Sequence, residues 1–260
     1  MRLNIHRRFV LGLLMATVAT VSVLGAAAQF AHRHVHHSHL SRVTNLFRLD
    51  TEYNLASWYS SLALMLCALV LALIAEARRR AGHEHARRWW GLAIIFFVLS
   101  LDEAMGLHEL LNTVLQPLRG LSSMLYFPWV LPELAFAVVV FLIYWPLLRT
   151  LRQSIRIRIL LAGCVYVFGA AGMEMISGWV LTRHSNLIIW YDAAASIEEI
   201  LEMLGVLLFF DAITEYLVET ISRVDIRLIG KPRRRRVRIP SAPIRPISRI
   251  GPGPPAPGIH

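Results

Sequence analysis

Apolar runs of about 20 residues, each long enough to cross a bilayer as an α-helix, recur along the chain and constrain its fold more than any other feature. The chain is 56% hydrophobic and only 17% charged, whereas a soluble domain carries about 25% charged residues. The runs lack the apolar–polar alternation of membrane β-strands. The sequence therefore predicts an all-α, six-span transmembrane helical bundle. The predicted spans are 9–31, 56–75, 89–111, 126–148, 159–181 and 193–217.

The placement of arginine predicts the orientation of these spans. Most of the 27 lysine and arginine residues precede the first span, lie within 78–88 or 149–158, or follow the sixth span. Basic residues concentrate on the cytoplasmic side of membrane proteins. We therefore expect both termini in the cytoplasm and an integral protein of a bacterial cytoplasmic (inner) membrane. The run 9–31 is interpreted as a retained helix, and a secretory signal cleaved near residues 26–28 is the alternative.

The C-terminal segment 231–260 differs in composition from the transmembrane domain predicted over residues 1–230. It is rich in Pro, Gly and Arg and has no acidic residue, so it cannot bury a core and is predicted to be disordered. Its basic run is expected to contact anionic lipid headgroups through Arg233, Arg234, Arg235 and Arg236. A topology anchor without a partner is the alternative reading. Nucleic-acid binding is not expected, because no aromatic residues interleave with the arginines.

Charged side chains interrupt two of the apolar runs. The run 89–111 ends in a stretch with Asp102, Glu103, His108 and Glu109, and the run 193–217 begins with three glutamates, Glu198, Glu199 and Glu202. A charged group at membrane depth costs about 2.5–3.5 kcal/mol on insertion scales, so such groups usually face a protein interior or a wet cavity.

Helical geometry predicts which of these side chains meet. At 100° per residue, Asp102, Gly106 and Glu109 share one face of the third span, and Glu198 and Glu202 share a face of the sixth together with Gly205. The two spans run in opposite directions in the predicted topology. We therefore expect Glu109 near Glu198 and Asp102 near Glu202, with the glycines allowing close approach.

Two further carboxylates fall at similar depth, Glu133 in the fourth span and Glu174 in the fifth. Many ionised carboxylates cannot share a low-dielectric volume, because like charges and burial both disfavour the charged form. Protonated carboxyl pairs, a bound metal or other cation, or a water-filled cavity would resolve the conflict. The predicted cation-binding residues, near the extracytoplasmic face, are Asp102, Glu103, His108, Glu109, Glu133, Glu174, Glu198, Glu199 and Glu202.

The residue pattern leaves the use of this site open. A cation-coupled transporter is one hypothesis, and the histidine-rich segment 32–39 could capture a divalent metal ion for it. A metal-dependent or acid–base enzyme acting on a lipid or quinone is the second, and a non-catalytic subunit with an acidic interface is the third. The Glu-x-x-His pairs of di-metal carboxylate bundles do not occur. The sequence His108-Glu-Leu-Leu-Asn112 lacks the second histidine of a zinc protease motif.

Overall fold

The computed structural model describes residues 7–34, 44–49, 51, 53–118, 126–183 and 188–220. The chain divides into two compact units, Met1–Arg223 and Val224–His260, and every described residue belongs to the first. The predicted tail 231–260, with Arg233 to Arg236, lies outside the described residues. All elements of the described part are helical, which confirms the all-α prediction there. They are α1 Arg7–His34, α3 Leu55–Arg80, α4 Ala86–Met105, α5 Leu107–Val114, the 3₁₀ turn η1 Gln116–Leu118, α6 Val130–Thr150, α7 Gln153–Val167, the π-helix η3 Phe168–Met173, α8 Glu174–Arg183 and α9 Ile188–Thr220.

Four segments of the described chain are long and apolar enough to cross a membrane, which indicates an integral membrane protein. The prediction of six spans is therefore wrong in number. The runs predicted at 89–111 and 193–217 correspond to α4 and α9, whose charged side chains, Asp102, Glu103 and Glu202 among them, make these helices too polar. The four segments, which overlap the other predicted spans, are Arg7–Arg33, Leu55–Arg80, Val130–Thr150 and Gln153–Thr182.

The run predicted as one helix over 89–111 is broken at Gly106. This residue has φ +57°, in the left-handed region, where it ends α4 and precedes α5. Only glycine adopts this conformation without steric cost. Tyr53 fixes the break from outside, because its hydroxyl donates to the Met105 carbonyl oxygen at 3.1 Å. Asp102 and Glu109 therefore lie on different helices, and the prediction that they share one helical face is wrong.

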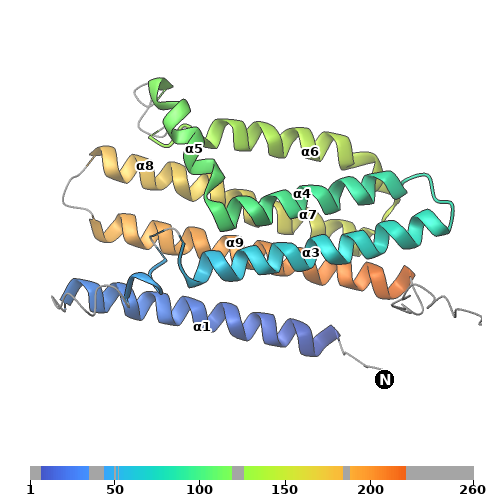
Figure 1. Cartoon of the computed structure of the whole chain (residues 1–260), viewed down its shortest axis with the longest axis horizontal. Coiled ribbons are helices and arrows are strands. Elements are labelled where there is room, and N and C mark those ends of the chain that lie inside the picture. Colours follow the sequence, from blue (N-terminus) through green and yellow to red (C-terminus); the bar gives the residue numbers. More distant parts are fainter. Residues whose placement is uncertain are drawn as a thin grey trace, which may run out of the picture. The chain divides into compact units, whose positions relative to one another are not determined.

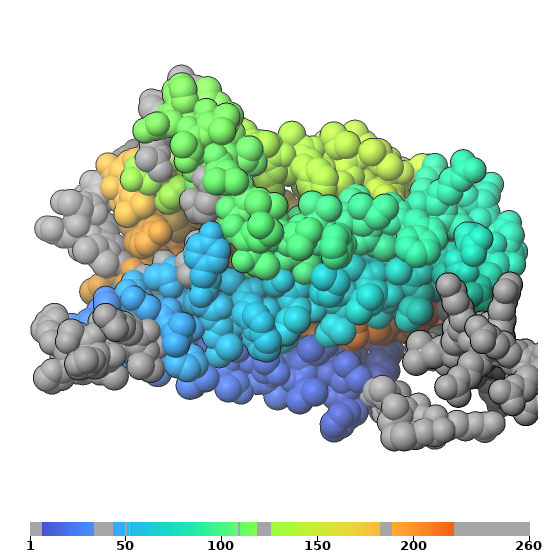
Figure 2. All heavy atoms as spheres, in the orientation of Figure 1, coloured from blue at the N-terminus to red at the C-terminus, as the bar shows by residue number. Residues whose placement is uncertain are grey.

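The long helices lie side by side and alternate in direction (Figure 1). Helix α9 packs against α1, α3, α7 and α8, and α3 also packs against α4. The N-terminal end of α1, the α3–α4 connection, the α6–α7 connection and the C-terminal end of α9 share one end of the first unit, at the right of Figure 1. On the face shown in Figure 2, α1, α3 and α4 form adjacent bands of side chains.

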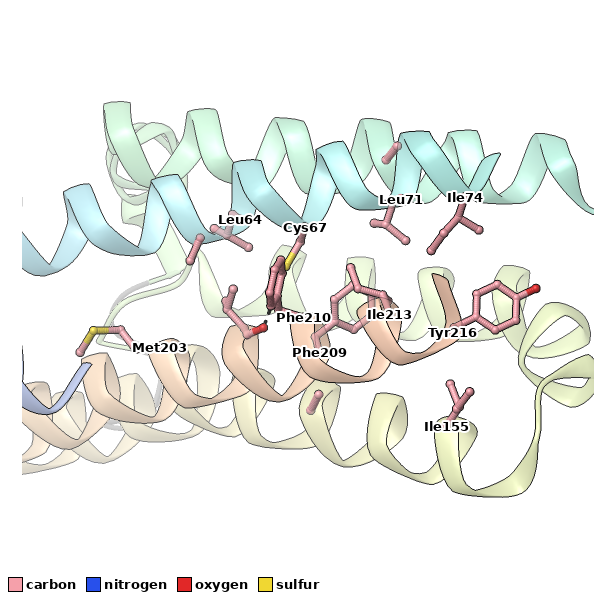
Figure 3. Close-up of a cluster of buried hydrophobic side chains, with 14 of the residues drawn as sticks. Leu64, Cys67, Leu71, Ile74, Ile155, Met203, Phe209, Phe210, Ile213 and Tyr216 are labelled. Carbon is pink, nitrogen blue, oxygen red and sulfur yellow. Dashed lines mark hydrogen bonds between the residues drawn. The ribbon is translucent and has the colours of Figure 1, made fainter. Parts of the chain in front are cut away.

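The core between α3 and α9 is apolar and tightly packed (Figure 3). Leu64, Leu71 and Ile74 repeat on one face of α3 and are at most 1% exposed, as expected for one face of a 3.6-residue helix. They face α9, where Phe209 and Ile213 belong to the same buried cluster. Interdigitation of this kind, rather than exclusion of water, is what holds helices together within a membrane.

Aromatic stacking fixes α4 against α9 at two levels. The rings of Phe96 and Phe209 stack with their centroids 4.3 Å apart, and those of Trp89 and Tyr216 stack at 4.9 Å. Helix α4 is therefore integrated into the bundle although it is too polar to count among the apolar spans.

Candidate functional site

A cavity of about 500 Å³ lies between α4, α5, α6, the α7–η3 segment and α9. Its wall contains seven of the nine residues predicted as cation ligands, contributed by four helices. These residues are Asp102, Glu103, His108, Glu133, Glu198, Glu199 and Glu202. We call this space the carboxyl-rich cavity.

The remainder of the cavity wall is largely apolar and aromatic. A ligand in this space would meet carboxyl groups on one part of the wall and hydrocarbon on another. The other lining residues are Val98, Leu99, Leu107, Leu111, Trp129, Pro132, Phe136, Tyr166 and Ala170.

The break at Gly106 brings Asp102 and His108 together. The His108 backbone N–H donates to Asp102 Oδ1 at 2.8 Å, and His108 Nδ1 lies 3.3 Å from Asp102 Oδ2. Asp102 thus satisfies a backbone donor in the first turn of α5, where helical N–H groups lack intrahelical partners. The His108 ring also lies against Trp129, with centroids 4.7 Å apart. On an unbroken helix the two side chains would point about 120° apart, so the sequence did not predict this contact.

Glu174 is held by two contacts at the edge of the cavity. Trp129 Nε1 donates to Glu174 Oε1 at 3.2 Å, and the Glu174 carboxyl group lies close enough to that of Glu198 for the two to interact directly. Two carboxyl groups can share a hydrogen bond only when one of them carries a proton, because an ionised carboxylate is an acceptor alone. The proximity of Glu174 and Glu198 is therefore compatible with one shared proton.

Close packing of the η3 segment on α9 makes this pair geometrically feasible. A Cβ atom at Gly169 would lie 3.0 Å from Leu201 Cβ and 3.1 Å from the Glu202 backbone N. A Cβ atom at Gly205 would lie 2.8 Å from Tyr166 Cβ. The role predicted for Gly205, close helix approach, is therefore present, although its neighbour is α7. The π-helix adds a wide turn just before Glu174, a distortion frequent at functional sites.

Glu133 links the two polar pairs. It interacts electrostatically with His108, Glu174 and Asp102. Its Oε2 atom is buried and has no hydrogen-bond partner among the described residues. An oxygen in this state is prepared to accept a proton or a donor from a ligand.

The described geometry shows no metal centre and does not test metal capture by the histidine-rich segment. Within the described residues, no group of three or more His, Cys, Asp or Glu side chains is arranged to hold a metal ion. The side chain of Glu109 and most of the histidine-rich segment, residues 35–39, lie outside the described part. A metal-ligand role for the nine residues therefore stays a prediction.

A cluster of ion pairs occupies the opposite end of α9. Arg158 contacts Asp211 at 3.0 Å and Glu215 at 2.6 Å. Arg7 contacts the same two carboxylates, and Arg152 contacts Glu215 at 2.6 Å. The hydrogen bond from Arg158 holds the pKa of Glu215 below its ordinary value. These contacts join α1 and α7 to α9 and give the two carboxylates a structural role.

A model of one protein family matches residues 10–214, a range that reaches from α1 into α9. The family is described as a domain of unknown function, DUF8692. The chain belongs to this family. All residues that line the carboxyl-rich cavity lie within the DUF8692 region. No curated protein and no solved structure matches the chain.

Proposed function

We propose that this chain is a membrane protein that binds a cation, foremost a proton, in the carboxyl-rich cavity. The observation that carries the proposal is the proximity of the Glu174 and Glu198 carboxyl groups at a cavity lined by five further carboxyl groups. Among the described residues that line the cavity, His108 is the one basic side chain, so most of the acidic charge needs another means of neutralisation. Protonation supplies it, because adjacent carboxyl groups in a poorly solvated site do not all ionise.

The arrangement favours the proton over a divalent metal. A metal site needs three or more ligands converging at about 2–2.5 Å from one point, and the described side chains offer no such group. Pairs of groups are arranged instead, Glu174 with Glu198 and Asp102 with His108. Pairs of this kind suit the binding and transfer of single protons.

Cation-coupled transport is the use that we place first. Intramembrane carboxyl and histidine groups are typical of proton relays in pumps and transporters. A cavity of about 500 Å³ has room for a small solute beside the proton-binding groups. Protonation of the carboxyl wall would then alter the affinity of the cavity for that solute.

An acid–base enzyme is the second candidate, favoured by the Asp102–His108 contact. A carboxylate at Nδ1 orients an imidazole and leaves Nε2 as its basic nitrogen, which is the arrangement of a general base. The apolar part of the wall, including Leu107 and Phe136, would suit a lipid or quinone. Solute uptake by proteoliposomes would favour the transporter, whereas product formation without uptake would favour the enzyme. If neither uptake nor product formation is detected, the hypothesis of a non-catalytic subunit remains.

For the orientation, we propose a bacterial inner membrane protein with both termini in the cytoplasm. Its support is the separation of charge along the first unit: Arg78, Arg79, Arg80 and Arg149 lie at the end shared by the α3–α4 and α6–α7 connections. The carboxyl-rich cavity lies toward the opposite end, beside α5, and would face the extracytoplasmic side.

Infrared difference spectroscopy of the full chain in nanodiscs tests the proton-sharing pair. The C=O stretch of a protonated carboxyl group is resolved from the bands of ionised carboxylates. We expect this band at neutral pH in the unmodified protein and its loss in both Glu174→Gln and Glu198→Gln. Glu76→Gln is the matched control, because Glu76 pairs with Arg79 and Arg80 far from the cavity, and it should keep the band. Absence of the band, or its persistence in both cavity variants, would refute the proposal.

Metal analysis of the same preparations tests the alternative that the bound cation is a metal ion. A stoichiometric metal that is lost in both Asp102→Asn and Glu174→Gln would replace the proton by a metal ion as the bound cation. If the protein contains no metal, and the infrared band is present in the unmodified protein and lost in both cavity variants, the proton is supported as the bound cation.

A further inference from the structure

A second cavity, of about 530 Å³, lies where α3, α6 and α9 end and α4 and α7 begin, away from the carboxyl-rich cavity. Its polar wall combines arginine, histidine and threonine side chains with two glutamates. We call it the Arg78 cavity. The lining residues that matter here are Arg78, His85, Thr150, Arg152, Tyr216 and Thr220.

The described hydrogen-bond partners of the Arg78 guanidinium are a histidine, a tyrosine and a threonine, with no carboxylate among them. Its Nη1 lies 2.8 Å from His83 Nε2, and its Nη2 donates to Tyr216 Oη at 2.5 Å and to Thr220 Oγ1 at 3.4 Å. Its Cζ lies 5.2 Å from the centre of the Tyr216 ring. Arg78 Nε is buried without a hydrogen-bond partner, and no Asp or Glu of the described part lies within ion-pair distance of the guanidinium.

The carboxylates nearby are already engaged by other basic groups. Glu219 contacts Arg152 at 2.8 Å, and Glu84 contacts His85 at 3.2 Å. Glu76 contacts Arg79 and Arg80 at 2.8 and 2.7 Å. Helical spacing explains why Glu76 pairs with Arg79 and Arg80. Positions three and four residues after Glu76 face it, whereas Arg78, two residues on, points elsewhere.

The stacking of Trp89 on Tyr216 makes the Arg78 position rigid. The two ring centroids are 4.9 Å apart, and Trp89 is 2% exposed. The hydroxyl that accepts from Arg78 is therefore held by a buried aromatic pair. A permanently charged group that is held in place with no described carboxylate within ion-pair distance is prepared for an anion.

The geometry points to a phosphate-binding site in the Arg78 cavity. Charge-assisted hydrogen bonds from a guanidinium to phosphate oxygens are stronger than neutral ones, so a phosphate can replace present partners of Arg78 Nη1 and Nη2. The hydroxyl of Thr220 lines the same space and can donate to a remaining oxygen, whereas the Thr150 hydroxyl already donates to the Leu147 carbonyl oxygen at 2.7 Å. The phosphate belongs either to an anionic lipid headgroup or to a soluble phosphate compound, and the chemistry of recognition is common to both.

Thermal unfolding of the full chain in nanodiscs tests the site. In one arm, inorganic phosphate is titrated into phosphatidylcholine nanodiscs, with chloride at equal ionic strength as the reference. In the other arm, phosphatidylglycerol replaces part of the phosphatidylcholine. We expect stabilisation in at least one arm, with an affinity that falls at least tenfold in Arg78→Gln and is unchanged in Arg79→Gln. Stabilisation by phosphatidylglycerol alone identifies a lipid headgroup, and stabilisation by inorganic phosphate identifies a soluble ligand.

Equal stabilisation of the Arg78→Gln and Arg79→Gln variants, or no stabilisation in either arm, would overturn the assignment. The first result would mean general attraction to a basic surface. A second variant, Tyr216→Phe combined with Thr220→Ala, keeps the stacked ring and removes the two hydroxyls that orient Arg78. It should weaken the affinity several-fold, and an unchanged affinity would likewise overturn the site. This variant decides the matter if Arg78→Gln does not fold.

Discussion

At Gly106 the backbone lies in the left-handed region, and a side chain there would also meet a neighbour. A Cβ atom would lie 2.8 Å from Tyr53 Oη. The left-handed conformation costs a non-glycine residue about 1–2 kcal/mol. The position matters for the site, because the turn at Gly106 allows His108 to reach Asp102.

Replacing Gly106 by alanine is expected to destabilise the protein. The backbone cost of about 1–2 kcal/mol corresponds to a drop in melting temperature of about 2–8 °C for a chain of this size. Contact with the Tyr53 hydroxyl should add to it. Thermal unfolding in detergent or nanodiscs measures the change.

Gly82→Ala separates the backbone cost from the effect of contact with Tyr53 in the destabilisation expected of Gly106→Ala. Gly82 has a similar φ of +70°, but a Cβ atom there would meet nothing within 4 Å. Gly82→Ala should therefore show the backbone cost alone and a smaller drop than Gly106→Ala. A Gly106→Ala variant as stable as the unmodified protein would contradict the account of the break.

On the scale of helices, the π-helix η3 controls how closely the Glu174-bearing segment approaches α9. The atoms nearest to a Cβ at Gly169 include the Glu202 backbone N at 3.1 Å and the Glu198 carbonyl oxygen at 3.2 Å. Backbone atoms cannot rotate away as the end of a flexible side chain can. An added methyl group must therefore move one segment away from the other.

We expect Gly169→Ala to weaken the interaction between Glu174 and Glu198. The protonated-carboxyl band should shift or lose intensity, and the melting temperature should fall. Gly163→Ala is a matched control on the preceding helix α7, since a Cβ there would meet nothing within 4 Å. Because alanine favours a helix over glycine by about 1 kcal/mol, this control should be neutral or stabilising. If Gly169→Ala and Gly163→Ala changed the infrared band and the melting temperature equally, η3 would not determine how closely the Glu174-bearing segment approaches α9.

Sequence reasoning found the helices but not their interruptions. Apolar runs predict helices because length and hydropathy are local properties, and charged residues within those runs marked Asp102, Glu133, Glu174 and Glu198 as worth attention. The break at Gly106 depends on Tyr53, 53 positions earlier in the chain. A helical wheel carried across that break places Glu109 on the wrong helix. The pairing of Glu198 with Glu174 depends on packing between helices, which no local pattern contains.

The Arg78 cavity, at the other end of the first unit, likewise depends on packing between helices that sequence reasoning could not predict. In the sequence, Arg78, Arg79 and Arg80 form a uniform basic run that serves as a topology signal. Their different partners follow from helical spacing relative to Glu76 and from the stacked Trp89–Tyr216 pair. The spacing could have been read from the sequence, but the cavity could not.

For the molecule as a whole, the distribution of charge along the bundle gives a testable orientation. The basic run at the end of α3 and the ion-pair cluster around Glu215 lie at one end, and the carboxyl-rich cavity lies toward the other. The positive-inside rule depends on basic residues in short connections. The α3–α4 connection should therefore lie in the cytoplasm.

Two single-cysteine reporters test this orientation in intact bacterial cells. In a background with Cys67→Ala and Cys164→Ser, one variant carries Glu84→Cys in the α3–α4 connection and the other carries Gln116→Cys in η1. Both positions are exposed. We expect a membrane-impermeant maleimide to label the Gln116→Cys variant in intact cells, and to label the Glu84→Cys variant only after the membrane is opened. The reverse pattern would place the carboxyl-rich cavity toward the cytoplasm, and protons would then enter it from the opposite side of the membrane.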